Sequence, residues 1–355
     1  NHCLNIYSYG NNITLTNSNF KSTNNIVILG NYSSSAYTTV NATDCTFETA
    51  NSSTIYAYYL NGDFVDDVVE FTPVINEEIR FKGVTFSYEE GKEVLHDIDI
   101  TIPKGGTVAL VGQSGSGKST LVQMFNGLLR PYEGRVLLDG ADIWAKPKDI
   151  NKIRFRVGLV MQYPEYQLFE ETIYKDIAYG PKNMGLSDDE IRQRVLEAAD
   201  FVGLDRELLD KSPFDLSGGQ KRRAAIAGII AMRPELLILD EPAAGLDPRG
   251  RDAIFNNIVE YQKKSGSTVL IVSHSMEDMA RYCDRLIVMS GAKILLEGEC
   301  REIFTRADEL SAVGLDVPQI TRLMLALKEK GIELDTSVFT VEEALEEILR
   351  LYQDK

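Results

Sequence analysis

The chain has 355 residues, 44% of them hydrophobic, so it is long enough for two domains and apolar enough for a packed core. Its net charge of −16 is concentrated towards the ends: residues 1–78 contribute −7 and residues 301–355 contribute −5, which leaves −4 for residues 79–300. Nothing in this distribution indicates the basic surface that a nucleic-acid-binding protein needs. The longest apolar run, AAIAGIIAM at 224–232, is far shorter than the roughly 20 residues that span a bilayer.

The first 60 residues are dominated by uncharged polar side chains, with 11 Asn, 8 Ser and 9 Thr. Within them, TNSNFKSTN at 16–24 matches TDCTFETAN at 43–51, and Phe20 aligns with Phe47 at a spacing of 27. A repeat of this length, with one apolar position among Asn and Thr, is typical of rungs of a parallel β-helix. Two rungs alone cannot bury a core, and a disordered polar tract is the alternative interpretation.

The composition changes after residues 61–78, which we interpret as a linker. Strand-like alternation begins at Ile79 with IRFKGVTFSY, and apolar strand runs follow at LLILD, TVLIVS and RLIVM. Helical segments separate these runs, and one of them begins with a capping box formed by Ser187 and Glu190. Strands interleaved with helices predict an α/β domain over residues 79–300.

A glycine-rich loop follows the predicted strand TVALV and precedes the predicted helix TLVQMFNGLL. Its sequence, GQSGSGKS at 112–119, fits the pattern G-x-x-x-x-G-K-[ST] in the strand–loop–helix context that this motif requires. We expect its backbone N–H groups and the helix N-terminus to attract phosphates, Lys118 to reach the β- and γ-phosphates of ATP, and Ser119 to ligate Mg²⁺. The nucleotide-binding residues predicted here are Gly112, Gly115, Gly117, Lys118, Ser119 and Thr120.

Two acidic residues end the apolar run LLILDE at 236–241. We expect Asp240 to face the metal ion, and Glu241, one residue further, to polarise the attacking water as general base. Two carboxylates at the end of a buried strand need a partner, which Mg²⁺ and phosphate supply.

Between the glycine loop and the acidic pair lies LSGGQ, at 216–220. In this order and spacing, the three motifs resemble those of the ATP-binding-cassette (ABC) ATPases, and the resemblance covers about residues 79–300. It implies a P-loop nucleotide-binding domain with a mixed sheet and a helical signature subdomain at about 163–232. It also implies ATP hydrolysis in a head-to-tail dimer, in which each ATP lies between one subunit's glycine loop and the other's LSGGQ.

The same resemblance assigns further roles. Tyr88 matches the aromatic residue that stacks on adenine, and Gln162 matches the glutamine that senses Mg²⁺ and the transport partner. His274, 34 positions after Asp240, matches the switch histidine that contacts the γ-phosphate. The remaining matches are the signature residues that contact ATP on the opposite subunit and the aspartate of the following loop: Ser217, Gly218, Gly219, Gln220 and Asp247.

The sequence after Gln162, QYPEYQLFEETIYKDIAYGP, resembles the ATPase subunits of energy-coupling-factor (ECF) importers, which take up vitamins and transition-metal ions. The matching residues are Gln162, Pro164, Gln167, Leu168 and Phe169. Ala243 departs from the pattern, in which Thr is commoner. The resemblance implies a peripheral protein at the cytoplasmic face of the cell membrane, which pairs with a copy of itself or a paralogue. It also implies a membrane coupling subunit that contacts about Gln162–Thr172, and a separate substrate-binding membrane subunit.

Residues 301–355 contain two helical patterns. One starts at Pro318 and carries an apolar stripe, and the other is capped by Thr340 and Glu343. Such stripes are normally core, and a self-association surface is the less common interpretation. The resemblance implies that the whole segment is a C-terminal helical extension used for dimerisation. The stripes consist of Ile320, Leu323, Met324 and Leu327 in the first helix, and Val341, Leu345, Ile348 and Leu349 in the second.

Three alternatives remain at this stage: the ATPase of another ABC importer, a non-transport ABC ATPase that acts on ribosomes or in DNA repair, and a surface protein defined by residues 1–60. The charged linkers and long coiled-coil insertions of the non-transport proteins are missing from the sequence. We expect residues 1–75 to be foreign to the ATPase: the tail of a β-helix surface protein, joined by a gene-model error or by a rare fusion.

Overall fold

The computed structural model describes residues 13–16, 19–22, 26–29, 40–43, 46–49, 55–58, 77–89 and 91–353, with side chains for 79–89 and 91–351. The chain divides into two compact units, Asn1–Asn76 and Glu77–Lys355. The predicted linker lies outside the described residues, except for Glu77 and Glu78, which begin the second unit.

The described part of the first unit consists of short parallel strand pairs. They are β1 (Ile13–Thr16) with β4 (Val40–Thr43), β2 (Asn19–Ser22) with β5 (Thr46–Thr49), and β3 (Ile26–Leu29) with β6 (Ile55–Tyr58). In the second pair Phe20 lies opposite Phe47, at the spacing of the sequence repeat. Each pair forms a sheet of only two strands, too few to enclose a core. The assignment of residues 1–60 to a β-helix-like fragment stays a prediction.

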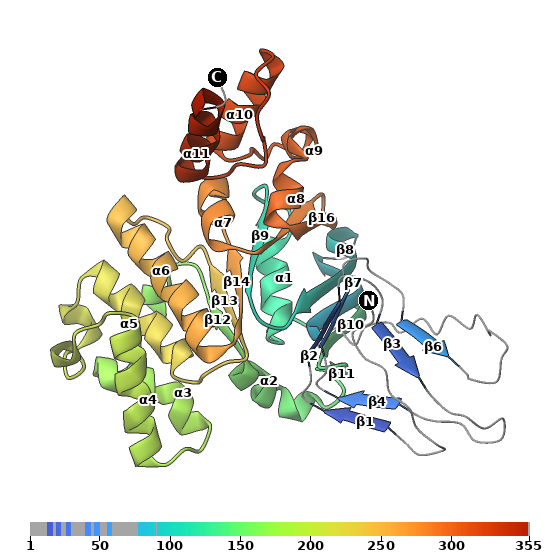
Figure 1. The fold of residues 1–355 in the computed structure, drawn as a ribbon. Helices are drawn as coiled ribbons and strands as arrows, with labels where there is room; N and C mark the ends of the chain where they lie inside the picture. Colours follow the sequence, from blue (N-terminus) through green and yellow to red (C-terminus); the bar gives the residue numbers. More distant parts are fainter. Residues whose placement is uncertain are drawn as a thin grey trace, which may run out of the picture. The chain divides into compact units, whose positions relative to one another are not determined.

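The second unit is built on two sheets (Figure 1). The antiparallel sheet has the order β11-β10-β7-β8: β11 (Ala141–Asp142), β10 (Glu133–Leu138), β7 (Glu77–Glu89) and β8 (Lys92–Pro103). The other sheet is mixed, with the order β12-β13-β14-β9-β15-β16: β12 (Val157–Val160), β13 (Leu236–Asp240), β14 (Thr268–Val272), β9 (Thr107–Gly112), β15 (Arg285–Ser290) and β16 (Lys293–Glu299). The predicted α/β class with a mixed sheet is confirmed.

Five strands of the mixed sheet, β12, β13, β14, β9 and β15, run parallel, and β16 is antiparallel to β15. Every residue of β9 and β14 is buried, as expected for parallel strands covered on both faces. Because parallel strands point the same way, their carboxyl ends meet at one edge of the sheet. The loops that leave this edge carry most of the predicted site residues.

Helix α1 (Lys118–Phe125) packs between the two sheets. Leu121 and Phe125 belong to a core shared by both sheets, and the Phe125 ring lies 4.6 Å, between centroids, from that of Phe81 in β7. This packing fixes the first turn of the helix directly after the glycine loop.

The other helices lie mainly around the mixed sheet, and α3, α4 and α5 gather on one side of it, apart from α1 (Figure 1). Ser187 and Glu190 form the predicted capping box at the start of α4. None of the helices in the described ranges has the length and apolar character of a membrane span. The helices and 3₁₀ turns are α2 (Ile150–Arg156), α3 (Ile173–Asn183), α4 (Asp188–Phe201), α5 (Gly218–Ile230), α6 (Pro248–Ser265), α7 (Met276–Tyr282), α8 (Cys300–Phe304), α9 (Ala307–Ala312), η1 (Pro147–Asp149), η2 (Pro164–Gln167), η3 (Arg206–Leu208) and η4 (Pro213–Asp215).

The two predicted C-terminal helices are present as α10 (Gln319–Glu329) and α11 (Val341–Gln353), around a small core that includes Met324 and Ala344. The expectation that both stripes are core was wrong for Leu323 of α10, which is 47% exposed, and for three residues of α11. The exposed fractions are 69% for Val341, 56% for Leu345 and 48% for Leu349. Because residues four apart share a helix face, these three side chains form one apolar strip on the surface.

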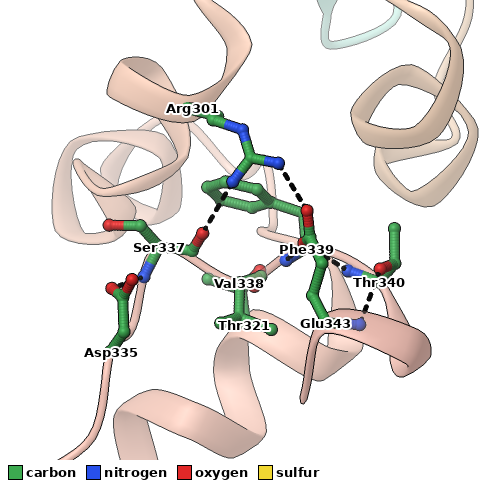
Figure 2. Close-up of polar contacts among 8 residues, drawn as sticks. All are labelled: Arg301, Thr321, Asp335, Ser337, Val338, Phe339, Thr340 and Glu343. Carbon is green, nitrogen blue, oxygen red and sulfur yellow. Dashed lines mark hydrogen bonds and ion pairs between the residues drawn. The ribbon is translucent and has the colours of Figure 1, made fainter. Parts of the chain in front are cut away.

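Glu343 joins α11 to the preceding loop and to α8 (Figure 2). Its carboxylate accepts the N–H groups of Phe339, at 2.9 Å, and Thr340, at 3.3 Å, and it pairs with the Arg301 guanidinium. Thr340 Oγ1 in turn accepts the Glu343 N–H at 3.2 Å, which confirms the predicted cap. Burial alone would raise the pKa of Glu343, but the hydrogen bonds from Phe339 and Arg301 hold it below its usual value.

We predict that Glu343→Ala lowers the free energy of unfolding by about 1–2 kcal/mol, because it removes a helix cap together with the contact to Arg301. Thermal unfolding of the purified chain measures the effect. Glu346→Ala is the matched control, since Glu346 is an exposed glutamate on the same helix. Equal stability of the two variants would contradict the role given to Glu343.

Candidate functional site

The predicted site residues come together at the carboxyl edge of the mixed sheet. Gly112 ends β9 and Asp240 ends β13, and these strands flank β14, which is followed by His274. Gln162 lies two residues beyond β12, the neighbour of β13. Four adjacent parallel strands therefore deliver glycine, carboxylate, imidazole and amide groups to one edge.

The glycine loop has a backbone that side chains would disturb. Gly117, with φ of 104°, lies so close to β8 that an added Cβ would stand 2.6 Å from the Val94 carbonyl oxygen. Gly115, with φ of 80°, faces open space instead. Ser116 Oγ, within this loop, is buried and has no hydrogen-bond partner among the described residues. The loop is thus packed tightly against β8 at Gly117, open at Gly115, and has an unsatisfied hydroxyl at Ser116.

Lys118 is 93% buried, with 7% of its surface exposed, and its Nζ donates to the carbonyls of Gly112, at 2.7 Å, and Gln113, at 2.9 Å. Burial lowers the pKa of Lys118, and the charges of Glu241 and Asp240 oppose that shift. The ammonium group is therefore held in the loop by carbonyl dipoles and two nearby carboxylates.

The pKa values of Asp240 and Glu241 are both raised by this environment, for partly different reasons. Burial raises the pKa of Asp240, while the charge of Lys118 and a hydrogen bond with Ser119 oppose the rise. Burial raises the pKa of Glu241 to about 7, and the adjacent charge of Asp240 adds to the effect. A carboxylate with a pKa near neutrality is suited to accept a proton at physiological pH.

Glu241 lies beside His274. His274 Nε2 is 2.9 Å from Glu241 Oε1, yet the contact lacks hydrogen-bond geometry, and Oε1 has no hydrogen-bond partner in the described structure. The histidine side chain is 68% exposed and that of Glu241 12%. The carboxylate is thus screened from solvent on most sides and reached by the imidazole on one.

Tyr88, near the end of β7, is next to α1. Its hydroxyl lies 3.2 Å from Thr120 Oγ1, and its ring meets that of Phe86 edge-on at 4.9 Å. With 59% of its surface exposed, Tyr88 offers an aromatic face beside the glycine loop.

The LSGGQ segment begins α5, away from the glycine loop of the same chain (Figure 1). Ser217 and Gln220 form a capping box, and a Cβ added to Gly218 or Gly219 would meet no atom of the described residues within 4 Å. Asp247 caps α6 through its Oδ1, which accepts the Gly250 N–H at 2.7 Å. The open N-terminal end of α5 suits an anion presented by another molecule.

A family model for ABC transporters matches residues 95–244. The energy-coupling factor transporter ATP-binding protein EcfA2 of Clostridium tetani is 53% identical over 282 residues, which cover 78% of this chain and 98% of that protein. EcfA2 of Caldanaerobacter subterraneus subsp. tengcongensis is 52% identical over 276 residues, 77% of this chain and 96% of the relative. The chain belongs to the ABC ATPases. Within them it belongs to the ATP-binding proteins of energy-coupling factor transporters.

Solved structures agree. CbiO1 of Clostridium perfringens, part of the CbiONQ ABC transporter complex, has a TM-score of 0.61 and 40% identity, and the match covers 70% of this chain and 99% of that one. The cassette MJ0796, dimeric and bound to ADP and phosphate, has a TM-score of 0.57 and 28% identity, over 62% of this chain and 98% of its own. The present chain is accordingly an ATP-hydrolysing enzyme of the ABC type.

The site of this ABC ATPase fits a nucleotide with a hard metal ion. Ser116 Oγ and Glu241 Oε1 are buried and accept no hydrogen bond from any described residue, and a phosphate or its attacking water would satisfy them. Ser119, Gln162 and Asp240 offer a hydroxyl, an amide and a carboxylate oxygen, and oxygen ligands are those that Mg²⁺ requires. Ser116 was not among the residues predicted from sequence, because the motif leaves its position unrestricted.

We predict that Gly117→Ala destabilises the ABC ATPase more than Gly115→Ala. Both substitutions force a left-handed conformation, at a cost of about 1–2 kcal/mol, but only Gly117 adds a clash with the Val94 carbonyl. Urea unfolding of the two variants measures the difference, and Gly115→Ala is the internal control. Equal losses would show that the approach to β8 does not constrain the loop.

Proposed function

We propose that this chain is the ATP-hydrolysing motor subunit of an energy-coupling-factor importer for a micronutrient, a vitamin or a transition-metal ion. It would act at the cytoplasmic face of the cell membrane, on a separate membrane complex that selects the solute. The proposal depends on the grouping of Lys118, Asp240, Glu241 and His274 at the carboxyl edge of the mixed sheet. The chain is also about half identical in sequence to energy-coupling factor ATP-binding proteins.

In the proposed reaction Glu241 is the general base. Its raised pKa lets it take a proton from water near neutral pH, and the buried setting excludes competing solvent. His274 would contact the γ-phosphate and keep it close to Glu241, since its imidazole already lies 2.9 Å from the Glu241 carboxylate. Lys118 and the loop N–H groups would neutralise the phosphate charge, and Tyr88 would stack on adenine.

Ser119, Gln162 and Asp240 would hold the metal ion. When bound, Mg²⁺ supplies positive charge to the phosphate oxygens and helps to orient them. Gln162 is exposed at the start of the segment proposed to meet the membrane subunit, so it is positioned to report that contact to the site.

A second ATPase subunit, a copy or a paralogue, would complete each site. Ser217 and Gly219 lie at the open end of α5, where they could contact ATP held by the other subunit, and Asp247 lies exposed at the start of α6. The apolar strip of Val341, Leu345 and Leu349 would be covered by the same pairing, which accounts for its exposure in a single chain.

The membrane coupling subunit would dock at about Gln162–Thr172. This segment exposes aromatic rings, with 85% of Tyr166 and 65% of Phe169 accessible. Gln167 and Phe169 line a cavity of about 310 Å³, together with Tyr179. Exposed aromatic side chains beside a cavity are typical of the anchoring points of an interface.

We predict that Glu241→Gln retains ATP binding and stabilises the closed dimer but removes turnover. In the wild-type protein kcat/KM should rise with pH through about 7, because the base acts in its ionised form and its pKa is raised to that value. Steady-state ATPase assays and size-exclusion chromatography with ATP measure both effects. Glu260→Gln, an exposed glutamate on α6, is the control. Wild-type hydrolysis by Glu241→Gln would refute the assignment of the base.

We further predict that Gln167→Ala with Phe169→Ala prevents co-purification of the membrane subunits, because the two side chains line the proposed docking cavity. Pull-down from detergent extracts, with mass spectrometry of the captured subunits, measures the loss. The control exchanges an exposed glutamine and an exposed aromatic residue elsewhere, Gln193→Ala with Tyr132→Ala. Undiminished capture by the first variant would move the docking surface away from this segment.

A further inference from the structure

Arg222 is a buried arginine in α5 whose guanidinium joins three separate segments. It lies five residues after Ser217, and only 5% of its surface is exposed. Nε donates to Glu165 Oε2 at 3.2 Å, and Nη2 donates to Glu165 Oε1 at 3.0 Å. The remaining nitrogen, Nη1, donates to the carbonyl of Ala244.

Each of these partners belongs to a functional segment. Glu165 is in η2, three residues after Gln162, inside the segment proposed to dock the membrane subunit. Ala244 lies three residues after Glu241, and its N–H donates to the Glu241 carbonyl at 3.1 Å, which closes a turn around the proposed base. Arg222 itself belongs to the helix that begins with the LSGGQ segment.

The shape of the guanidinium makes this connection rigid. Two parallel N–H groups grip the Glu165 carboxylate as a fork, and the third nitrogen lies in the same plane. A displacement of η2 therefore moves the plane as a whole, and with it the hydrogen bond to Ala244. A lysine could keep the charge but not these three directions at once.

Stability alone does not require such a group. A buried ion pair costs desolvation on both sides, and apolar side chains of similar volume are often at least as stabilising. The side chains of Arg222 and Glu165 are 6% and 17% exposed, so the pair bears this cost. What an apolar pair could not supply is a directional hydrogen bond to the turn that carries Glu241.

We propose that Arg222 is a positioning residue that transmits docking of the membrane subunit to Glu241. Contact at the Gln162–Thr172 segment moves Glu165, the fork carries the movement to the Ala244 carbonyl, and the turn sets the Glu241 carboxylate against its water. The same guanidinium passes the movement to α5. The inference rests on the proposed function, because it takes this segment as the docking surface.

The test uses Arg222→Lys in the complete complex with its membrane subunits, purified in detergent and reconstituted. We expect the complex to assemble and the Kd for ATP to stay within about twofold, because Arg222 does not contact the glycine loop in the described structure. We expect kcat to fall about tenfold or more, because misplacement of a reacting group by about 1 Å can lower a rate by about 100-fold. Arg206→Lys is the matched control: Arg206 grips Asp200 with a similar fork, on an exposed surface.

A second variant guards against misfolding. Glu165→Leu with Arg222→Met removes both charges together, so no unpaired buried charge remains. Its thermal stability should be close to wild type while its kcat is as low as that of Arg222→Lys. A kcat equal to wild type in either variant overturns the inference.

Loss of complex assembly in both variants also overturns it, since the pair would then only shape the docking surface. The proposed docking surface is tested independently by the Gln167→Ala and Phe169→Ala capture experiment. If capture depends on Gln167 and Phe169 but kcat does not depend on Arg222, the docking surface stands and only the role proposed for Arg222 is wrong.

Discussion

The structure of this ATPase depends on the interaction between the buried ammonium group of Lys118 and two nearby carboxylates. The three groups lie at the carboxyl edge of the parallel strands in the mixed sheet. Burial destabilises all three charged groups, lowering the pKa of Lys118 and raising those of Asp240 and Glu241. The attraction between Lys118 and the carboxylates offsets part of that cost, but burial and repulsion from Asp240 leave Glu241 with a pKa of about 7. The fold tolerates this because β9 and β13 are fixed by fully apolar neighbours on both faces.

The surrounding elements can be understood from this constraint. Helix α1 is held between two sheets, so the glycine loop before it has a fixed base and an open face. The carboxyl edge of the sheet brings Asp240 and His274 together although they lie 34 residues apart in sequence. The LSGGQ segment lies on a separate group of helices and therefore faces outwards. In the proposed site, a second subunit would bring these parts together.

Sequence patterns predicted the α/β class, the strand runs and the capping boxes of Ser187 and Thr340, because each depends on residues near one another in the chain. They failed for Leu323 and for the apolar strip of α11, because an apolar stripe indicates that something covers it, but not whether the cover is the same chain. They also missed Arg222, whose partners lie 57 and 22 residues away and follow no local period. Its burial is visible only once α5, η2 and the turn after Glu241 are packed together.

Glu241 has a further property, a left-handed backbone with φ of 51°, which costs a glutamate about 1–2 kcal/mol relative to glycine. Two backbone hydrogen bonds hold Glu241 in this conformation. The Glu241 N–H donates to the Val272 carbonyl at 3.0 Å, and the Glu241 carbonyl accepts the Ala244 N–H. Glycine would relax this strain, and neutral side chains would relieve the electrostatic repulsion from Asp240. If Glu241 is the base, as proposed, stability and catalysis conflict at this position, and selection for heat resistance alone would tend to replace it.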